Sequence, residues 1–356
     1  MNSLFTIELS IMLVILVAIP LLLWGFRNLP EERWQFLAIL PTPKGGSEWL
    51  GTNITFYGLI SAVAYAVSVG MFIFLCAAVN QPFVPVVAFI ACTLAVAIPA
   101  SRLVARWVEG GKANFTIGGA TFVAVVSLPL TLWVVQWLAV SIGTRSPDTL
   151  AMLAAAALAY TLGEAIGRLG CLSFGCCYGK PLDQAGPIER ALYGPGATTY
   201  RGKLKKIAYA SNLENTPVIA VQSIASVVLF GLFLIGLWLF WRGHFGAAFC
   251  VCLSGSQLWR IYSETLRADY RGKGKFSAYQ WMAVATCVFA ILGVIWLTTL
   301  AASDRSTPEF TRAWEAFAQL PVVVALQVLV VLIVWYMGRS TVTGSSVTLK
   351  LIREKM

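Results

Sequence analysis

Charged side chains are scarce in this sequence, and histidine is almost absent. Only 12% of its 356 residues are charged and one is histidine, whereas 58% are hydrophobic and the mean hydropathy is +0.76. A soluble domain cannot bury so much apolar surface, so this composition excludes an ordinary soluble globular protein. It predicts an integral membrane protein.

The sequence also lacks the marks of several other protein classes. No stretch resembles a nucleic-acid-binding module, and the basic run Lys203–Lys206 is too short to indicate one. The eight cysteines lie mostly in apolar stretches, where a thiol packs as a small hydrophobe, so we expect no disulfide framework. The first apolar stretch shows no small-residue cleavage site, and we expect it to be retained as a span. The expected partners are membrane lipids and no nucleic acid.

Long apolar runs dominate what is present. Nine of them are long enough, at about 20 residues, to cross a bilayer as helices. We therefore expect an all-α integral membrane protein of about nine transmembrane helices, with a small polar head segment at residues 171–216. The expected spans are residues 7–26, 54–78, 83–104, 115–142, 149–170, 217–241, 246–266, 279–300 and 320–338.

Three other segments have patterns of their own. Residues 27–53 are predicted to form an amphipathic loop that contains Pro and Gly. Residues 301–319 are predicted to form a loop with a short interfacial helix. In the tail, residues 347–352 alternate weakly between apolar and polar side chains, which is typical of a strand.

Lysine and arginine divide unevenly between the two sets of connections. The connections after the first, third, fifth, seventh and ninth spans carry 20 Lys and Arg residues, and the opposite side carries four. Cytoplasmic loops of membrane proteins are enriched in these residues. The bias predicts an N-terminus outside, a C-terminus inside, and a head segment at the cytoplasmic face.

The most informative run extends from Gly163 to Pro181. Arg168 lies close to the end of the fifth span, where a charge is costly unless it meets an anionic partner or a watery cavity. Gly167 and Gly170 allow a ligand or another backbone to come close. The run predicts a site for an anionic lipid headgroup. The alternative is an arginine that only snorkels to the interface.

Glu164 lies four residues before Arg168, one helical turn away. It is either the counter-ion of this arginine or an acid or base in catalysis. The spacing alone leaves both roles open.

A second charged group lies at the end of the seventh span. Arg260, Glu264 and Arg267 are spaced by four and three residues, so they share one helix face. This group either serves a binding site or is a self-neutralising ion cluster.

Three cysteines follow Arg168 within one short stretch. Cys171, Cys176 and Cys177 allow three interpretations: packing, a thiolate nucleophile beside the arginine, or a metal site. Their C-x4-C-C spacing matches no common zinc pattern, and the single histidine, His244, belongs to the other face. We expect packing, with no metal and no cofactor. Gly118 and Gly119 open the fourth span, where they favour close helix contact or a backbone that faces a ligand.

These residues resemble the prolipoprotein diacylglyceryl transferase family, whose members move the diacylglyceryl group of phosphatidylglycerol onto a lipobox cysteine. Gly167-Arg168-Leu169-Gly170 matches the family signature, and the cysteine run that ends in Gly-Lys-Pro is similar to one branch of the family. Further pieces fall in the family's order. They are Phe56-Tyr57-Gly58-Leu59, Ser101-Arg102-Leu103, Gly118-Gly119, the segment from Asn215 to Gln222, the group Arg260, Glu264 and Arg267, and Ala278-Tyr279-Gln280.

The resemblance implies an organisation and a set of site residues. It covers about residues 52–300, which leaves residues 1–50 as an extra span and loop, 51–300 as a seven-helix core with the head segment, and 301–356 as an extra loop, span and tail. It implies catalytic roles for Arg168, Arg260 and Glu264, and Glu164, from its position beside Arg168, is a candidate base. The implied substrate-binding residues are Tyr57, Arg102, Gly118, Gly119, Gly167, Gly170, Cys171, Cys176, Cys177, Gln222 and Arg267.

The resemblance also implies a reaction and a location. We expect a transferase of the bacterial plasma (inner) membrane that takes phosphatidylglycerol as donor and a prolipoprotein, or a small molecule, as acceptor. Two departures bear on the acceptor. Thr116-Ile117 stands where the family has a histidine, and Cys171 and Cys176 stand where its signature has asparagine and glutamate. The charge bias also places the head segment inside. An acceptor at the cytoplasmic face and a non-enzymatic transporter of anionic lipids are therefore the alternatives.

Overall fold

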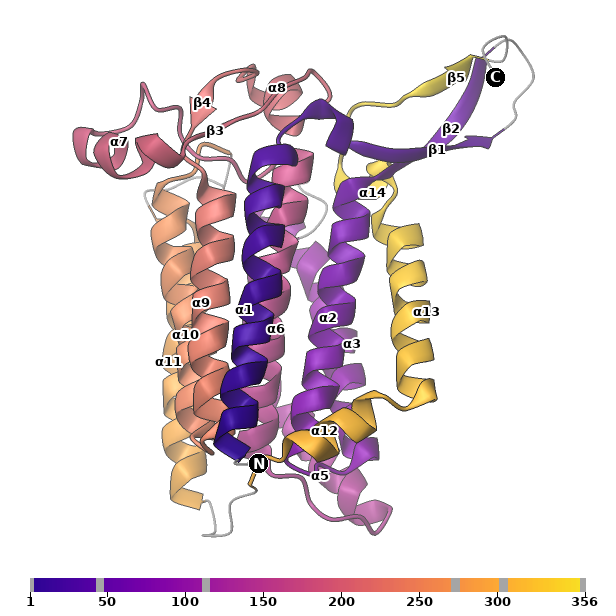
Figure 1. Cartoon of the computed structure of the whole chain (residues 1–356), viewed down its shortest axis with the longest axis vertical. Helices are drawn as coiled ribbons and strands as arrows, with labels where there is room; N and C mark the ends of the chain where they lie inside the picture. Colours follow the sequence, from indigo (N-terminus) through magenta and orange to yellow (C-terminus); the bar gives the residue numbers. More distant parts are fainter. Residues whose placement is uncertain (1–2, 43–47, 111–115, 270–275, 301–306, 353–356) are drawn as a thin grey trace.

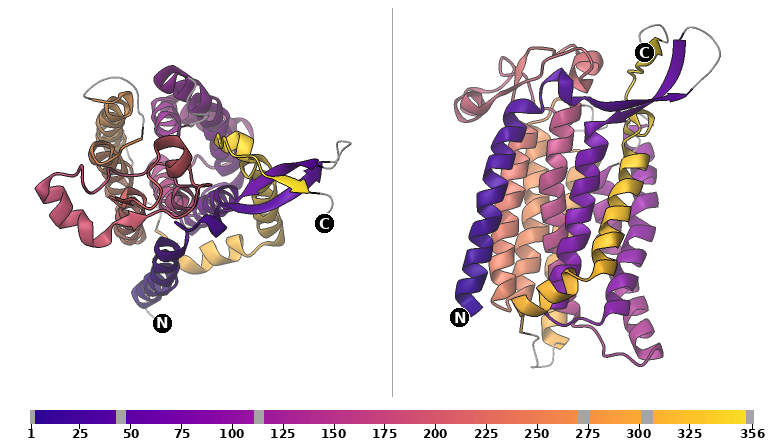
Figure 2. Two further views of the ribbon diagram at one scale, coloured as in Figure 1. Left: turned by 90° about the horizontal axis from the view of Figure 1, so that it is seen from above. Right: turned by 45° about the vertical axis from the view of Figure 1, so that its right-hand side comes forward.

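The chain forms a bundle of long helices that stand side by side, with a head segment and a small sheet at one end (Figures 1 and 2). The structure is a computed structural model, which describes residues 3–42, 48–110, 116–269, 276–300 and 307–352. The expected all-α membrane architecture is confirmed.

The bundle is built from helices that run alternately in opposite directions (Figure 1). They are α1 (Ser3–Asn28), α2 (Phe56–Ala78), α3 (Phe83–Glu109), α4 (Ile117–Val126), α5 (Leu128–Ser141), α6 (Thr149–Phe174), α9 (Val221–Trp241), α10 (Phe245–Thr265), α11 (Ala278–Leu300) and α13 (Leu320–Met337). The other elements are η1 (Glu32–Trp34), β1 (Phe36–Thr42), β2 (Glu48–Thr55), α7 (Pro187–Tyr193), η2 (Gly194–Gly196), β3 (Thr198–Thr199), α8 (Lys206–Ser211), β4 (Pro217–Val218), α12 (Phe310–Phe317), α14 (Ser340–Thr343) and β5 (Lys350–Ile352).

Seven of the described helices are long and apolar enough to cross a membrane: α1, α2, α3, α6, α9, α11 and α13. The pair α4 and α5 counts as an eighth span, bent by 56°. These are eight of the about nine expected spans, and the ninth, α10, is present as a helix of 21 residues but is less apolar than the others. Gln257, Arg260 and Glu264 lower its hydropathy, because it carries part of the polar group described below.

Helix α6 lies at the centre of the bundle and packs against α2, α9 and α10. Ala151, Ala154 and Ala155 in its alanine-rich first half are fully buried, because small side chains let neighbouring helices approach closely. Asp148 caps its start by accepting a hydrogen bond from the Ala151 amide. Gly175 ends it in the left-handed conformation, which glycine adopts at little cost. The polar end of α6 is thereby held at a fixed place beside the head segment.

The structure of the segments outside the bundle agrees only in part with the predictions made from the sequence. The predicted loop 27–53 contains strands β1 and β2, an antiparallel pair that was not predicted. The weakly alternating tail forms β5 on the edge of β2, which confirms that expectation. The short helix predicted within 301–319 is α12, which runs across the bundle at the end opposite the head (Figure 1).

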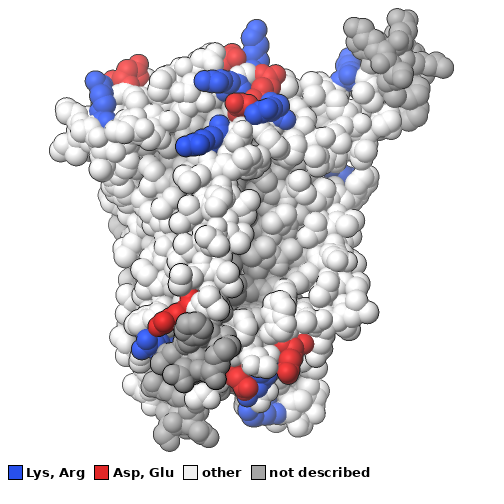
Figure 3. All heavy atoms as spheres, in the orientation of Figure 1, with Lys and Arg blue, Asp and Glu red and all other residues white. Residues whose placement is uncertain are grey.

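Charged side chains gather at the two ends of the molecule and leave a band between them nearly free of charge on the face shown in Figure 3. Lys and Arg are prominent at the end that carries the head segment. This distribution fits a bundle whose middle lies in hydrocarbon and whose ends reach water.

Candidate functional site

The site is centred on Glu164, a buried carboxylate near the head end of α6. Tyr160, Glu164 and Arg168 follow one another at intervals of four, so all three lie along one face of α6. Arg260 reaches the same carboxylate from α10. Residues 96 positions apart thus form one polar group between two packed helices.

Glu164 accepts hydrogen bonds from three donors. The Tyr160 hydroxyl donates to Oε2 at 2.5 Å, and Arg260 Nη2 donates to Oε1 at 2.5 Å. Arg168 Nη2 donates to the same Oε1. Only 3% of the Glu164 side chain is exposed, against 13% and 11% for the two arginines. Two cations therefore converge on one buried anion, so these three side chains together carry a formal charge of plus one.

Both guanidiniums keep hydrogen-bonding capacity. Within the described ranges, the buried Nε atoms of Arg168 and Arg260 have no hydrogen-bond partner. A buried donor without an acceptor is costly, and anionic oxygens are the acceptors that guanidinium groups prefer. Gly118 of α4 adds room on one side, because a Cβ there would lie 2.9 Å from Arg260 Nη1. The group is therefore suited to a second, exogenous anion.

The predicted cluster of Arg260, Glu264 and Arg267 is arranged differently from expectation. Arg260 forms its ion pair with Glu164, whereas Glu264 contacts Arg267 at 3.4 Å and accepts from the Ser277 hydroxyl at 3.3 Å. Glu264 still lies close enough to Arg260 for their charges to interact, so the three residues remain one charged group. Helix α10 ends at Thr265, so Arg267 lies just beyond the helix that carries Arg260 and Glu264.

Arg267 also forms a bidentate ion pair with Asp269, at 2.7 and 2.6 Å. Burial lowers the pKa of Arg267, but the carboxylate of Asp269 outweighs it and raises that pKa above its ordinary value. The backbone just after α10 is bound to the loop that follows the cysteines, because the Lys180 amide donates a hydrogen bond to the Leu266 carbonyl at 2.9 Å. These contacts fix the end of α10 against the start of the head segment.

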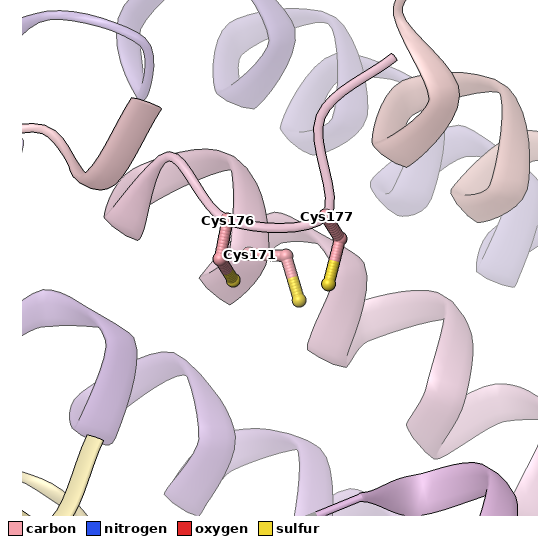
Figure 4. Close-up of side chains that lie close together, drawn as sticks. All are labelled: Cys171, Cys176 and Cys177. Carbon is pink, nitrogen blue, oxygen red and sulfur yellow. The ribbon is translucent and has the colours of Figure 1, made fainter. Parts of the chain in front are cut away.

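The three cysteines after Arg168 come together in space (Figure 4). The sulfur atoms of Cys171, Cys176 and Cys177 all lie within 4.8 Å of one another. Cys171 is on the last turn of α6, and the chain reverses after Gly175 to bring the other two back over it. Sequence reasoning favoured simple packing here, and the sequence gives no sign of how close the three sulfur atoms lie.

Other residues expected at the site divide into two groups. Tyr57 of α2 is buried against Cys171, and Gly170 lies at the contact between α6 and this tyrosine. Gln222 of α9 donates at 2.7 Å to the Cys176 carbonyl and at 2.7 Å to the Tyr200 hydroxyl. All of these border the cysteine cluster.

The residues of the second group do not border the cysteine cluster. Arg102 of α3 is exposed and its guanidinium lies 5.5 Å from the centre of the Tyr336 ring. Gly119 packs closely on Val104 of α3, which is a helix contact. No atom lies within 4 Å of a Cβ built at Gly167, so this face of α6 is open.

Two functional side chains were missed by sequence reasoning. Tyr160 was predicted only as part of an apolar span, although its spacing from Glu164 was a usable signal. Lys205 was counted as a basic loop residue but is fully buried, with Nζ donating to the carbonyls of Leu29 at 2.9 Å and Ser173 at 2.5 Å. Burial lowers the pKa of Lys205 to about 7. This residue ties the head segment to the ends of α1 and α6, and no local pattern reveals it.

Comparison with known families gives one match. The model of a family described as prolipoprotein diacylglyceryl transferase matches residues 48–296, which are 249 of the 356 residues. The matched range begins in β2, ends in α11, and includes both arginines and all three cysteines. The search of curated proteins found no match to this chain.

Proposed function

This chain belongs to the prolipoprotein diacylglyceryl transferase family, and from this premise we propose that it transfers a diacylglyceryl group from phosphatidylglycerol to a thiol acceptor at the head end of the bundle. The family places it among multi-pass membrane transferases of lipoprotein biosynthesis. The donor, the acceptor and the roles of individual residues are our proposal.

One observation carries the proposal: the two arginines of α6 and α10 converge on a single carboxylate and retain unpartnered Nε donors among the described residues. A phosphodiester between Arg168 and Arg260 receives these donors and places a second negative charge between the two guanidiniums. Planar guanidiniums bind phosphate oxygens in pairs, which lysine cannot do.

The same contacts favour the reaction. When the bond between the glyceryl carbon and the phosphate oxygen breaks, negative charge grows on the departing glycerol phosphate. Arg168 and Arg260 are already in place to stabilise that charge, so no reorganisation is needed at the moment of transfer. The lone pairs of Glu164 are engaged by three donors, so we assign it as the counter-ion that positions both arginines and not as the base. Glu264 and Asp269 fix Arg267 at the edge of the site.

The acceptor is a lipobox cysteine or another nucleophile met at the head end. The family histidine is replaced by Thr116-Ile117 at the start of α4, so its role as proton acceptor passes to another group. The uneven distribution of Lys and Arg favours a cytoplasmic head end in the bacterial plasma membrane, with the N-terminus outside.

The test uses purified protein in nanodiscs with phosphatidylglycerol and a lipobox peptide, and mass spectrometry of peptide and lipid. We expect a thioether-linked diacylglyceryl peptide and glycerol phosphate as products. Arg168→Lys and Arg260→Lys should each lose at least roughly a hundredfold in rate, the scale for one transition-state donor. Arg312→Lys, on α12 at the opposite end, is the matched control and should keep full activity.

Two outcomes separate the alternatives. Consumption of phosphatidylglycerol without a modified peptide, in the presence of a cytosolic small-molecule fraction, indicates another acceptor. Binding of phosphatidylglycerol without any consumption overturns the transferase proposal and favours a transporter of anionic lipids.

A further inference from the structure

The three-cysteine cluster has a geometry that packing alone does not require. Cys177 adopts φ of 58°, in the left-handed region that residues other than glycine rarely occupy. This conformation turns its thiol toward the other two. Together with the glycine that ends α6, it places three sulfur atoms from one short stretch within 4.8 Å of one another (Figure 4).

The cluster is held from outside as well as by its own turn. Gln222 of α9 donates a hydrogen bond to the Cys176 carbonyl. Tyr57, Phe174 and Met337 pack against the cysteines. Cys176 and Cys177 remain half-buried, so a small ion has a path to the cluster.

Two guanidinium groups lie close to the cluster. The guanidinium of Arg168 is near enough to Cys171 and Cys177 for their charges to interact, and Arg267 is near Cys177. Three thiolates around a divalent ion carry a net charge of only minus one, so the ion itself compensates most of the charge that three thiolates bring to the cluster.

We propose that Cys171, Cys176 and Cys177 bind one thiophilic metal ion of the zinc type. Sulfur atoms that share a zinc ion at about 2.3 Å stand about 3.8 Å apart in a tetrahedral site. The largest separation in the cluster therefore needs to close by only about 1 Å. Binding exchanges three thiol protons for the ion and involves no change of oxidation state.

Three protein ligands leave one position of a tetrahedral ion for a substrate, which is the pattern of catalytic zinc sites. This part of the inference rests on the proposed function. The acceptor thiol loses its proton to water as its sulfur takes the fourth position. The sulfur lone pair then forms the bond to the glyceryl carbon, and the electron pair of the breaking carbon–oxygen bond leaves with glycerol phosphate. The cluster would thereby replace the family histidine.

The first test measures metal directly. The full-length protein, purified in detergent with a reducing agent and dialysed against zinc, should contain about one zinc ion per chain by elemental analysis. Cobalt substitution should give thiolate-to-cobalt charge-transfer bands. Cys171→Ser, Cys176→Ser and Cys177→Ser should each weaken zinc binding by roughly tenfold or more. The control Cys287→Ser, a cysteine of α11 that is not part of the cluster, should bind as the wild type does.

A second measurement covers variants that fail to fold. A mercurial reagent added to the wild type should release the zinc in step with the loss of three thiols. A wild-type protein that holds no zinc under these conditions, or a disulfide among the three cysteines in the reduced preparation, overturns the inference. Full activity of the enzyme after its zinc has been removed refutes the catalytic role of the ion and leaves the proposed function standing. Zinc bound to a protein that modifies no acceptor refutes the function and leaves the site standing.

Discussion

Replacement of Glu164 by glutamine tests whether the two arginines form an anion site. Glutamine keeps the shape of the side chain but removes the negative charge on which Arg168 and Arg260 converge. Because only 3% of the Glu164 side chain is exposed, the variant leaves two buried cations without their anion. Loss of one partner from a buried ion pair costs about 3–5 kcal/mol. We expect this cost in membranes that contain only zwitterionic phosphatidylcholine.

Phosphatidylglycerol should reverse much of that loss, because its phosphate takes the place of the carboxylate between the guanidiniums. A ligand that binds only the folded state stabilises it by about 2.7 kcal/mol at a hundred times its Kd. The increase in Tm from phosphatidylcholine to phosphatidylglycerol nanodiscs should therefore be larger for Glu164→Gln than for the wild type. Intrinsic tryptophan fluorescence during heating measures both values.

The matched control is Glu309→Gln at the opposite end of the molecule. Glu309 also pairs with an arginine, Arg312, but 54% of its side chain is exposed, so the pair contributes about 1 kcal/mol or less. Its Tm should change little and in the same way in both lipids. Equal gains from phosphatidylglycerol in the Glu164 variant and the wild type would refute the anion site.

Three further predictions concern other parts of the molecule. Burial holds the pKa of Lys205 at about 7, below its ordinary value, so the protein binds fewer protons folded than unfolded above that pH. The free energy of unfolding should therefore rise between pH 7 and about 10.5, by up to about 1.4 kcal/mol per pH unit, and Lys205→Met should lose this rise in thermal melts. Gly118→Ala places a methyl group 2.9 Å from Arg260 Nη1 and should reduce transfer roughly tenfold or more, whereas Gly293→Ala, with open space around it, should not. A reporter fused within residues 181–216 should give a cytoplasmic signal; a periplasmic signal would contradict the orientation inferred from charge and favour the lipoprotein acceptor.

Local patterns in the sequence predicted much of the site. The closeness of Glu164 to Arg168 follows from their spacing along one helix, and the family resemblance led us to propose Arg168 and Arg260 for the site. Contacts between different helices could not be predicted from such spacing. The ion pair between Arg260 and Glu164 depends on how α6 and α10 pack, and the spacing along α10 favoured Glu264 as the partner instead.

The strand pair β1 and β2 shows a second reason for failure. Its residues were predicted as a loop because Pro, Gly and charged side chains interrupt the alternation of a strand. The two strands exist because they pair with each other and with β5 from the far end of the chain. Such pairing is a long-range property that local composition does not carry.

The sequence by itself determined that this chain is a helical membrane protein and how its charges divide among the connections, and it led us to propose Arg168 and Arg260 for the site. These are properties of apolar runs and of residues within a few positions of one another, where the bilayer and the helix impose fixed lengths and periods. Only the tertiary structure decided that two arginines share Glu164 and that three cysteines meet at one point. Both arrangements depend on packed helices and a reversed turn, and those bring atoms together in ways that no linear spacing describes.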